Sequence, residues 1–217
     1  MSVKKYIIIN VIKIINLWVL MIKMKKFFVE LIGTFFLVFT IGVSGNVWAI
    51  ATVLMAMIYM GGYISGAHYN PAVTVGFIMR GTITVKEGLV YWIAQFSGAL
   101  IGGLLSIWIT GTPKSIGITE GMLAQAIVLE LLFTSAMMLV ILNVATSPKS
   151  KGNQYYGLAI SSVVLAGMLT AGPISGAAFN PAVSIGHNIF DLAGHGLDIA
   201  MHLATSLAGA ALGALGY

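Results

Sequence analysis

The residues most able to do chemistry form two copies of one tripeptide, Asn70-Pro71-Ala72 and Asn180-Pro181-Ala182. Proline at the first helical position has its φ preset and lacks only an N–H that would have no partner there. Asparagine is a favoured N-cap residue. Each motif therefore predicts the start of a helix whose amino end carries about half a positive charge. The chemistry that this favours is hydrogen bonding and electrostatics at a helix terminus, with the asparagine amides as donors.

The two motifs lie in longer matching segments. Residues 65–74 (Ser-Gly-Ala-His-Tyr-Asn-Pro-Ala-Val-Thr) recur as 175–184 (Ser-Gly-Ala-Ala-Phe-Asn-Pro-Ala-Val-Ser), 110 positions later. A second repeated pattern, Glu-Leu-x-x-Thr, begins at Glu30 and again at Glu130. The apolar stretches after each asparagine, 70–80 and 180–190, are too short to span a membrane, because ten helical residues rise about 15 Å. They predict two half-helices.

The elements that must position the motifs are membrane spans. Only 8% of the 217 residues are charged and 59% are hydrophobic, whereas a soluble domain carries about 25% charged residues. Apolar runs between Gly, Pro and charged clusters predict six spans at 27–44, 47–64, 88–109, 122–145, 155–173 and 197–216.

Each half of the chain then holds three spans and one half-helix. Because three is odd, the halves must be inverted relative to each other, with a site near the midplane between them. We expect an all-α membrane protein with six transmembrane helices and two re-entrant half-helices in a 3+3 inverted repeat. The channel domain covers 27–217, with one repeat at 27–110 and the other at 122–217.

Lysine and arginine placement predicts the orientation of this integral membrane protein. We expect a cell-membrane protein with its amino and carboxyl termini in the cytoplasm. In this orientation ten basic residues lie on the cytoplasmic side and Lys114 alone lies outside, as the positive-inside rule requires. These ten do not interleave with aromatics as a nucleic-acid patch would. They are Lys4, Lys5, Lys13, Lys23, Lys25, Lys26, Arg80, Lys86, Lys149 and Lys151.

The amino-terminal segment, 1–26, is apolar but interrupted. Asn10, Lys13 and Asn16 fall on one face of a helix, which suits a segment lying in the membrane interface or cytoplasm rather than a seventh span. An alternative is that Met24 is the true start. No small-residue cleavage site follows, so a secretory signal peptide is not predicted.

A solute at the junction of the half-helices would meet two asparagine amides and two positive helix ends. Water or another neutral molecule can exchange its hydrogen bonds for those donors. A cation, or a proton moving along a water chain, meets electrostatic repulsion in addition to its desolvation cost. The predicted function is passive flow of small neutral solutes with ions and protons excluded.

From about Met24 to its end the chain resembles the aquaporin (major intrinsic protein) family. The paired Asn-Pro-Ala motifs, the Ser-Gly-Ala-His-Tyr segment, the two span glutamates and Tyr-Trp-Ile-Ala-Gln at 91–95 carry the resemblance. It implies a homotetramer in membrane lipid with one pore per subunit. The pore asparagines would be Asn70 and Asn180.

The resemblance also maps a four-residue selectivity filter, and here the sequence departs from the family pattern. Family members usually have an arginine directly after the second motif, where this chain has Val183. By spacing, the other filter positions are Ile50, Met168 and Ala177. All four are apolar, a pattern that resembles some plant tonoplast members. The implied solutes widen to water, ammonia, hydrogen peroxide, urea and small polyols.

Three further residues belong to the expected site. Glu30 and Glu130 are carboxylates within spans, which are rare and are functional or paired; the family resemblance favours support of the re-entrant loops over a proton relay. His68 would line the cytoplasmic vestibule or pack within its loop. The remaining histidines have no metal spacing, so no metal or cofactor is expected.

Two other functions compete with a channel. An ion-coupled transporter also uses inverted repeats but needs midplane charges, and only Glu30 and Glu130 are present. A poorly conducting structural or junction member of the family is the second, because an apolar ring can gate by dewetting. With no cysteine, no Ser–His–acid set and no nucleotide loop, an enzyme is not predicted.

Overall fold

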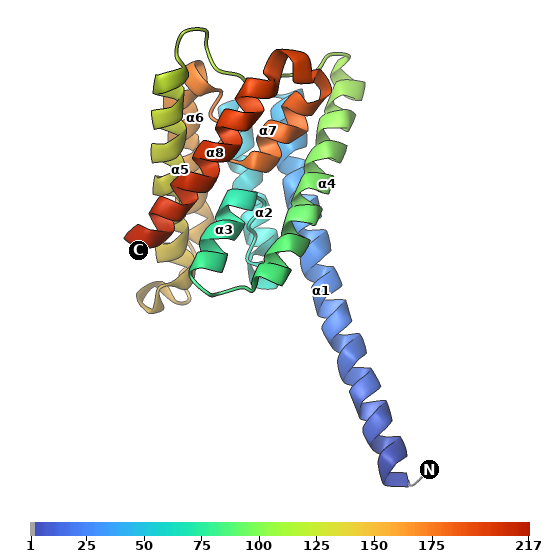
Figure 1. Cartoon of the computed structure of the whole chain (residues 1–217). Coiled ribbons are helices and arrows are strands. Elements are labelled where there is room, and N and C mark those ends of the chain that lie inside the picture. The colour runs from blue at the N-terminus through green and yellow to red at the C-terminus, as the bar shows by residue number, and fades with distance from the viewer. Residues whose placement is uncertain (1–2) are drawn as a thin grey trace.

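The computed structural model describes residues 3–217, and within them every element of regular structure is helical. Figure 1 shows the long helices packed around two short ones, α3 and α7, which lie in the middle of the bundle. The elements are α1 (Val3–Val43), α2 (Val47–Ser65), α3 (Pro71–Met79), α4 (Val85–Thr110), α5 (Leu123–Thr146), η1 (Pro148–Ser150), α6 (Tyr156–Ser175), α7 (Pro181–Asn188), η2 (Ile189–Asp191) and α8 (Leu192–Gly216).

The helix ends have local causes in the sequence. The Asn46 side chain caps α2 by accepting from the N–H groups of Trp48 and Ala49. Thr84 and Glu87 form a reciprocal capping box at the start of α4. At their carboxyl ends α2 and α6 stop at Gly66 and Gly176, whose φ values of 89° and 81° place both glycines in the left-handed region.

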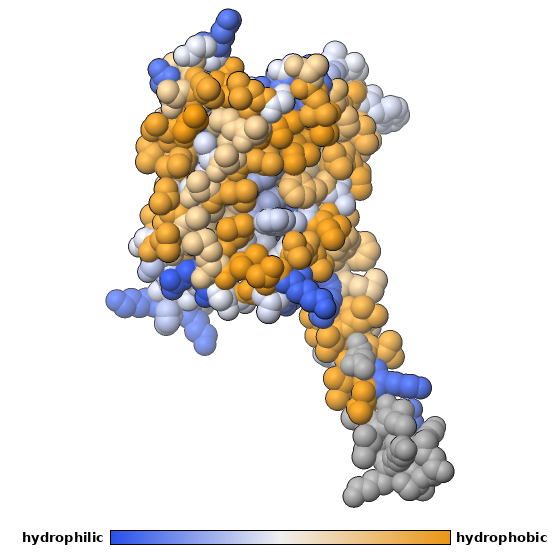
Figure 2. All heavy atoms as spheres, viewed as in Figure 1, coloured by the Kyte–Doolittle hydropathy of each residue, from blue (hydrophilic) through white to orange (hydrophobic). Residues whose placement is uncertain are grey.

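The long helices can cross a membrane. Among the described residues, six helices are long and apolar enough, counting the segment Leu17–Val43 of α1. Figure 2 shows apolar side chains covering the visible flank of the bundle and hydrophilic ones gathered at its two ends. The predicted all-α architecture of six spanning helices is therefore confirmed.

Glycines bring equivalent helices of the two halves into close contact. In the first half α1 packs on α4, and a Cβ on Gly102 would lie 2.8 Å from the backbone oxygen of Phe35. In the second half α5 packs on α8, and a Cβ on Gly213 would lie 2.6 Å from the backbone oxygen of Ser135. Backbones this close are possible only where the side chain is missing.

The largest departure from the sequence prediction is the start of the first helix. The sequence places the first span at 27–44, whereas α1 continues without a break back to Val3. No Gly or Pro occurs between Val3 and Ile32, so nothing in the backbone ends the helix, and the polar residues that interrupt the apolar pattern are tolerated in it. The amino-terminal part of α1 projects beyond the bundle (Figure 1). Residues 1 and 2 of the predicted amino-terminal segment lie outside the described part.

Candidate functional site

A cavity of about 1070 Å³ runs along the bundle between the two halves. Lys114 lines one of its mouths, together with the loop that joins α4 to α5. Lys151 lines the other, together with the loop that joins α5 to α6. We call these the Lys114 end and the Lys151 end. The wall therefore contains residues from both ends of the molecule, as a pore through it requires.

The two half-helices meet at the middle of this cavity and are bonded to each other. The Asn70 side chain caps α3, with Oδ1 accepting from the N–H of Ala72 at 2.8 Å, and its Nδ2 donates to the backbone oxygen of Phe179 at 2.9 Å. The Asn180 side chain does the same for α7, and its Nδ2 donates to the backbone oxygen of Tyr69 at 2.9 Å. Each asparagine thus binds the loop of the opposite half.

These bonds leave each asparagine one donor for a solute. A carboxamide carries two N–H bonds, and one of them is used in the contact with the opposite loop. Asn70 and Asn180 are 5% and 4% exposed and both line the cavity. Pro71, Ala72, Pro181 and Ala182 are buried behind them.

The loops before the asparagines supply acceptors. Residues 66–69 and 176–179 line the cavity, and within residues 3–217 no protein donor bonds the carbonyl oxygens of Gly176, Ala177 or Ala178. The facing walls come from helices and carry apolar side chains such as Leu54, Ile160 and Val164. The cavity therefore has a polar strip along otherwise apolar walls.

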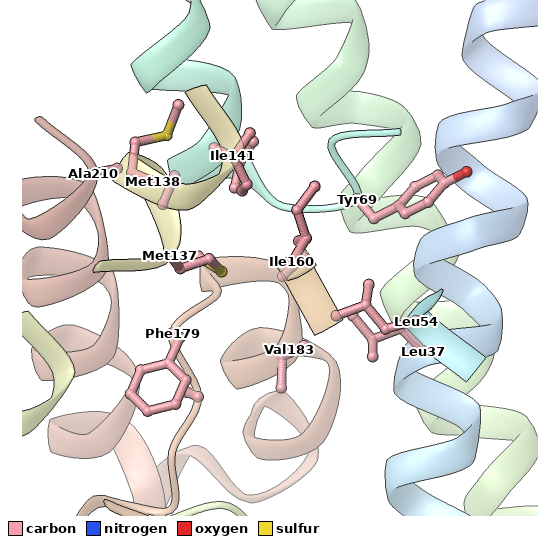
Figure 3. Close-up of a cluster of buried hydrophobic side chains, with 14 of the residues drawn as sticks. Leu37, Leu54, Tyr69, Met137, Met138, Ile141, Ile160, Phe179, Val183 and Ala210 are labelled. Atoms are coloured by element: carbon pink, nitrogen blue, oxygen red, sulfur yellow. The ribbon is translucent and has the colours of Figure 1, made fainter. Parts of the chain in front are cut away.

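Both loops adopt a backbone conformation that is costly outside glycine. Ala67, Tyr69, Ala177 and Phe179 have φ values of 50°, 49°, 51° and 49°. Each such residue costs of order 1–3 kcal/mol and persists only when its surroundings hold it in place. In Figure 3 the side chains of Tyr69 and Phe179 point to opposite sides, away from each other. Tyr69 donates to the backbone oxygen of Met57 at 2.8 Å.

Glu30 and Glu130 bond the same loops from behind. Glu30 accepts from the N–H groups of His68 and Tyr69 at 3.0 and 2.7 Å. Glu130 accepts from the N–H groups of Ala178 and Phe179 at 2.9 and 2.8 Å. Both carboxylates are fully buried. Neither Glu30 nor Glu130 is among the described residues that line the cavity.

Two further side chains, not predicted from the sequence, support the same loops. Tyr91 donates to the backbone oxygen of Ser65 at 2.7 Å, and His202 Nε2 lies 2.7 Å from the backbone oxygen of Ser175. Since Ser65 and Ser175 are equivalent in the repeat, Tyr91 and His202 support equivalent positions of the two loops. The signal was weak, because the two residue types differ. His202 Nε2 also lies 3.8 Å from Glu130.

The four residues mapped by spacing to a filter lie on one cavity. Ile50, Met168, Ala177 and Val183 all line it and are 5%, 8%, 9% and 3% exposed. Ile50 comes from α2, Met168 from α6, Val183 from α7 and Ala177 from the loop between α6 and α7. The four residues thus come from four segments of the chain, and their role as a selectivity filter remains a prediction.

His68 lies on the cavity wall between α2 and α3. Its ring stacks on Phe77 with centroids 4.3 Å apart, and its Nδ1 is 3.1 Å from the Thr74 hydroxyl. His68 thus lines the cavity and packs on α3, and its place in a cytoplasmic vestibule remains a prediction. His195 lies apart from the cavity wall, with Nδ1 2.7 Å from Asp198. Among the described residues no group of His, Cys, Asp and Glu could hold a metal ion.

A bundle of membrane-length helices around a through-going cavity, with two half-helices meeting inside it, defines a channel-forming integral membrane protein. Comparison with protein families identifies it further. The profile described as "Major intrinsic protein" matches residues 41–217. The chain therefore belongs to the major intrinsic protein family, whose members are membrane channels for water and small solutes rather than enzymes.

Several relatives are similar over most of the chain. "Aquaporin NIP1-1" of Zea mays is 35% identical over 89% of this chain and 73% of the relative. "Aquaporin NIP1-1" of Oryza sativa subsp. japonica is 36% identical over 89% and 73%. "Nodulin-26" of Glycine max is 32% identical over 75% and 66%. These names are of the NIP type, and the likeness of the filter pattern to tonoplast members stays a prediction.

A solved structure supports the fold. The aquaglyceroporin from Plasmodium falciparum superposes with a TM-score of 0.70, covering 89% of this chain and 93% of that one. The two sequences are 24% identical. At this identity the likeness bears on the architecture alone.

Proposed function

We propose that this chain is a passive pore for water and other small uncharged solutes, ammonia, hydrogen peroxide, urea and small polyols among them. The observation that carries the proposal is the junction of the half-helices, where Asn70 and Asn180 each keep one amide N–H for the cavity. A neutral solute arriving there trades its bonds with water for these donors and for the carbonyl oxygens of the two loops.

Ion exclusion follows from the charges around the cavity. Both half-helices direct their positive amino ends to the middle. Lys114 and Lys151 line the two mouths, and of residues 3–217 no carboxylate side chain lines the wall. A cation must lose its hydration without meeting a compensating negative charge, so its passage is unfavourable.

The apolar residues at the Lys114 end support a broad range of neutral solutes. The side chains of Ile50, Met168, Ala177 and Val183 add no hydrogen-bond donor and no charge to the wall. Without an arginine at position 183, the constriction does not require a solute to satisfy a guanidinium. Water therefore loses the advantage that a narrow, positive filter gives it, and ammonia and urea gain relative to water.

The position of the carboxylates argues against an ion-coupled transporter. Coupling requires a charge that the solute or its partner ion can reach. Glu30 and Glu130 are instead fully buried behind the loops, where their oxygens accept bonds from loop N–H groups. We assign them to holding the loops in place.

The homotetramer, the cell-membrane location and the cytoplasmic termini also belong to this proposal. The family resemblance supports the homotetramer, and the uneven lysine distribution supports the cytoplasmic termini. Labelling of an added carboxyl-terminal cysteine from one side of sealed vesicles tests the orientation. Cross-linking in lipid tests the assembly.

The function is tested in liposomes. The purified protein is reconstituted, and vesicle shrinkage under an impermeant osmolyte is recorded by stopped-flow light scattering. The same vesicles then receive an ammonia gradient, with an internal pH dye as the reporter. A potassium gradient with a potential-sensitive dye measures ion leakage.

We expect water and ammonia fluxes well above those of protein-free liposomes, and potassium leakage equal to theirs. Fast water flow with no added ammonia flux would show that the apolar constriction still selects water. No flux of any solute would favour the poorly conducting structural member. Uptake that depends on a sodium or proton gradient would favour the transporter.

A further inference from the structure

The loop between α4 and α5 lines the cavity although it belongs to neither repeat motif. The loop between α4 and α5 contributes Lys114, Ser115, Ile116 and Gly117 to the wall at the Lys114 end. Within this loop Ile116 is the buried side chain, at 9% exposed, while its neighbours Lys114 and Ser115 are exposed. A loop that inserts a single apolar side chain into a pore needs something to hold it there.

Asn188 holds it through two hydrogen bonds. The backbone N–H of Ile116 donates to Asn188 Oδ1 at 2.9 Å, and Asn188 Nδ2 donates to the backbone oxygen of Ile116 at 2.7 Å. Asn188 is fully buried and is the last residue of α7. A carboxamide that matches both backbone groups of one residue fixes its position and its orientation together.

Further bonds fasten the same loop on the other side of Ile116. The N–H of Ile118 donates to Asp198 Oδ1 at 3.0 Å. The N–H of Thr119 donates to the backbone oxygen of Ile174 at 2.9 Å. The loop is thus tied to α6, α7 and α8, although it is distant from all three in sequence.

Ile116 lies next to the proposed filter. A Cβ placed on Gly176 would lie 2.5 Å from Ile116 Cγ2, and Gly176 directly precedes Ala177. The side chain therefore packs against the loop that carries one filter residue. It lines the cavity at the same end as the apolar side chains of Ala177 and Val183.

We propose that Ile116 is a specificity-determining residue of the pore, and that Asn188 is the positioning residue that sets how far Ile116 reaches into it. This inference rests on the proposed function. It concerns the size of the largest neutral solute that passes, whereas Asn70 and Asn180 concern which kind of solute passes.

The first test removes the side chain. Ile116→Ala is reconstituted in liposomes, and permeability is measured by stopped-flow light scattering for water, urea, glycerol and erythritol. The glycerol-to-water permeability ratio is expected to rise by about tenfold or more, because a change of one methylene in an apolar pocket already changes discrimination by about tenfold. Ile118→Ala is the matched control, because it removes the same atoms from the same loop but Ile118 does not line the cavity.

The second test examines the positioning residue. Asn188→Leu keeps the number and branching of the side-chain heavy atoms but loses both hydrogen bonds, so the loop is released and the glycerol-to-water ratio is expected to rise. Combined with Ile116→Ala it should add nothing, because the side chain that the loop positions is already gone. Such non-additivity marks coupled residues, and a general loss of stability would not produce it.

The outcomes separate this inference from the function on which it rests. If the unmodified protein conducts while Ile116→Ala and Ile118→Ala share its solute ratios, the inference is overturned and the channel stands. If the unmodified protein passes no solute above empty liposomes, the proposed function fails first. Should Asn188→Leu not assemble, the comparison of Ile116→Ala with Ile118→Ala still decides.

Discussion

At the scale of single residues, the site is a set of hydrogen bonds arranged in pairs. Asn70 and Asn180 each cap one half-helix and bind the opposite loop. Glu30 and Glu130 each accept two loop N–H groups. Val183 stands where the family resemblance predicts an arginine, and it is the residue whose replacement is most informative.

Val183→Arg should narrow the range of solutes. An arginine here introduces five N–H donors and a fixed charge into a wall formed by Ile50, Met168 and Ala177. The ammonia-to-water permeability ratio is expected to fall about tenfold, the low end of what a hydrogen bond to a charged group contributes. Val183→Leu, which stays apolar, is the control. An unchanged ratio in the arginine variant would refute the role given to the apolar filter.

Glu130→Gln should weaken the loop that it bonds. The amide can accept from Ala178 or from Phe179 but presents its N–H₂ to the other, so one buried bond to a charged acceptor is lost at a cost of about 1–3 kcal/mol. We expect a lower melting temperature in detergent and reduced water flow. Glu87→Gln, at an exposed helix cap, is the control. Equal effects of the two changes would contradict the support role.

At the scale of elements, the two halves use the same contacts between equivalent helices. Gly98 and Gly102 let α4 approach α1, and Gly209 and Gly213 let α8 approach α5. These glycines are needed for close packing and not for a special φ. These glycines therefore face a neighbouring helix, where a side chain would clash, and do not face the lipid.

Gly209→Ala should destabilise the second half. The added Cβ would lie 2.7 Å from the backbone oxygen of Leu131 and 2.8 Å from Thr134 Cβ, and overpacking of this kind costs about 1–3 kcal/mol. Gly196→Ala is in the same helix with nothing within 4 Å of the new atom. It should be neutral or slightly stabilising, since Ala favours helix. Thermal denaturation in one detergent compares the two, and equal midpoints would count against the packing role.

At the scale of the whole molecule, the amino-terminal part of α1 is separate from the bundle that forms the pore. Leu17, Trp18 and Leu20 are 60%, 63% and 54% exposed, whereas from Val29 onward α1 has a buried face against the bundle. Its apolar and basic residues suit a membrane interface, which remains a prediction.

A protein that starts at Met24 should therefore keep its pore. We expect liposome water and ammonia permeabilities within about twofold of the full chain, because exposed helix away from packed elements contributes little to stability. A start at Ile32 is the contrasting variant, since it removes Glu30. Loss of permeability in the Met24 variant would show that the segment serves the channel itself.

Much of this architecture could be predicted from sequence. The half-helices could, because Asn-Pro-Ala is a local signal of a helix start, and two copies at matching places identify the repeat. The spacing from the two motifs predicted four apolar filter positions, and all four line the cavity, while their role as a filter remains a prediction. Ile116 could not, since its place depends on Asn188, Asp198 and Ile174, which are remote in sequence.

The reciprocal asparagine bonds also bear on how the molecule is made. Asn70 leaves the ribosome more than a hundred residues before Phe179, whose carbonyl it requires. Until then the first half-helix has no counterpart, and the loop ahead of it is held only by contacts within the first half, such as those with Glu30 and Tyr91. We expect the last step of biogenesis to be the joint seating of both half-helices, so a chain truncated before Phe179 would insert its first spans without completing an aqueous path.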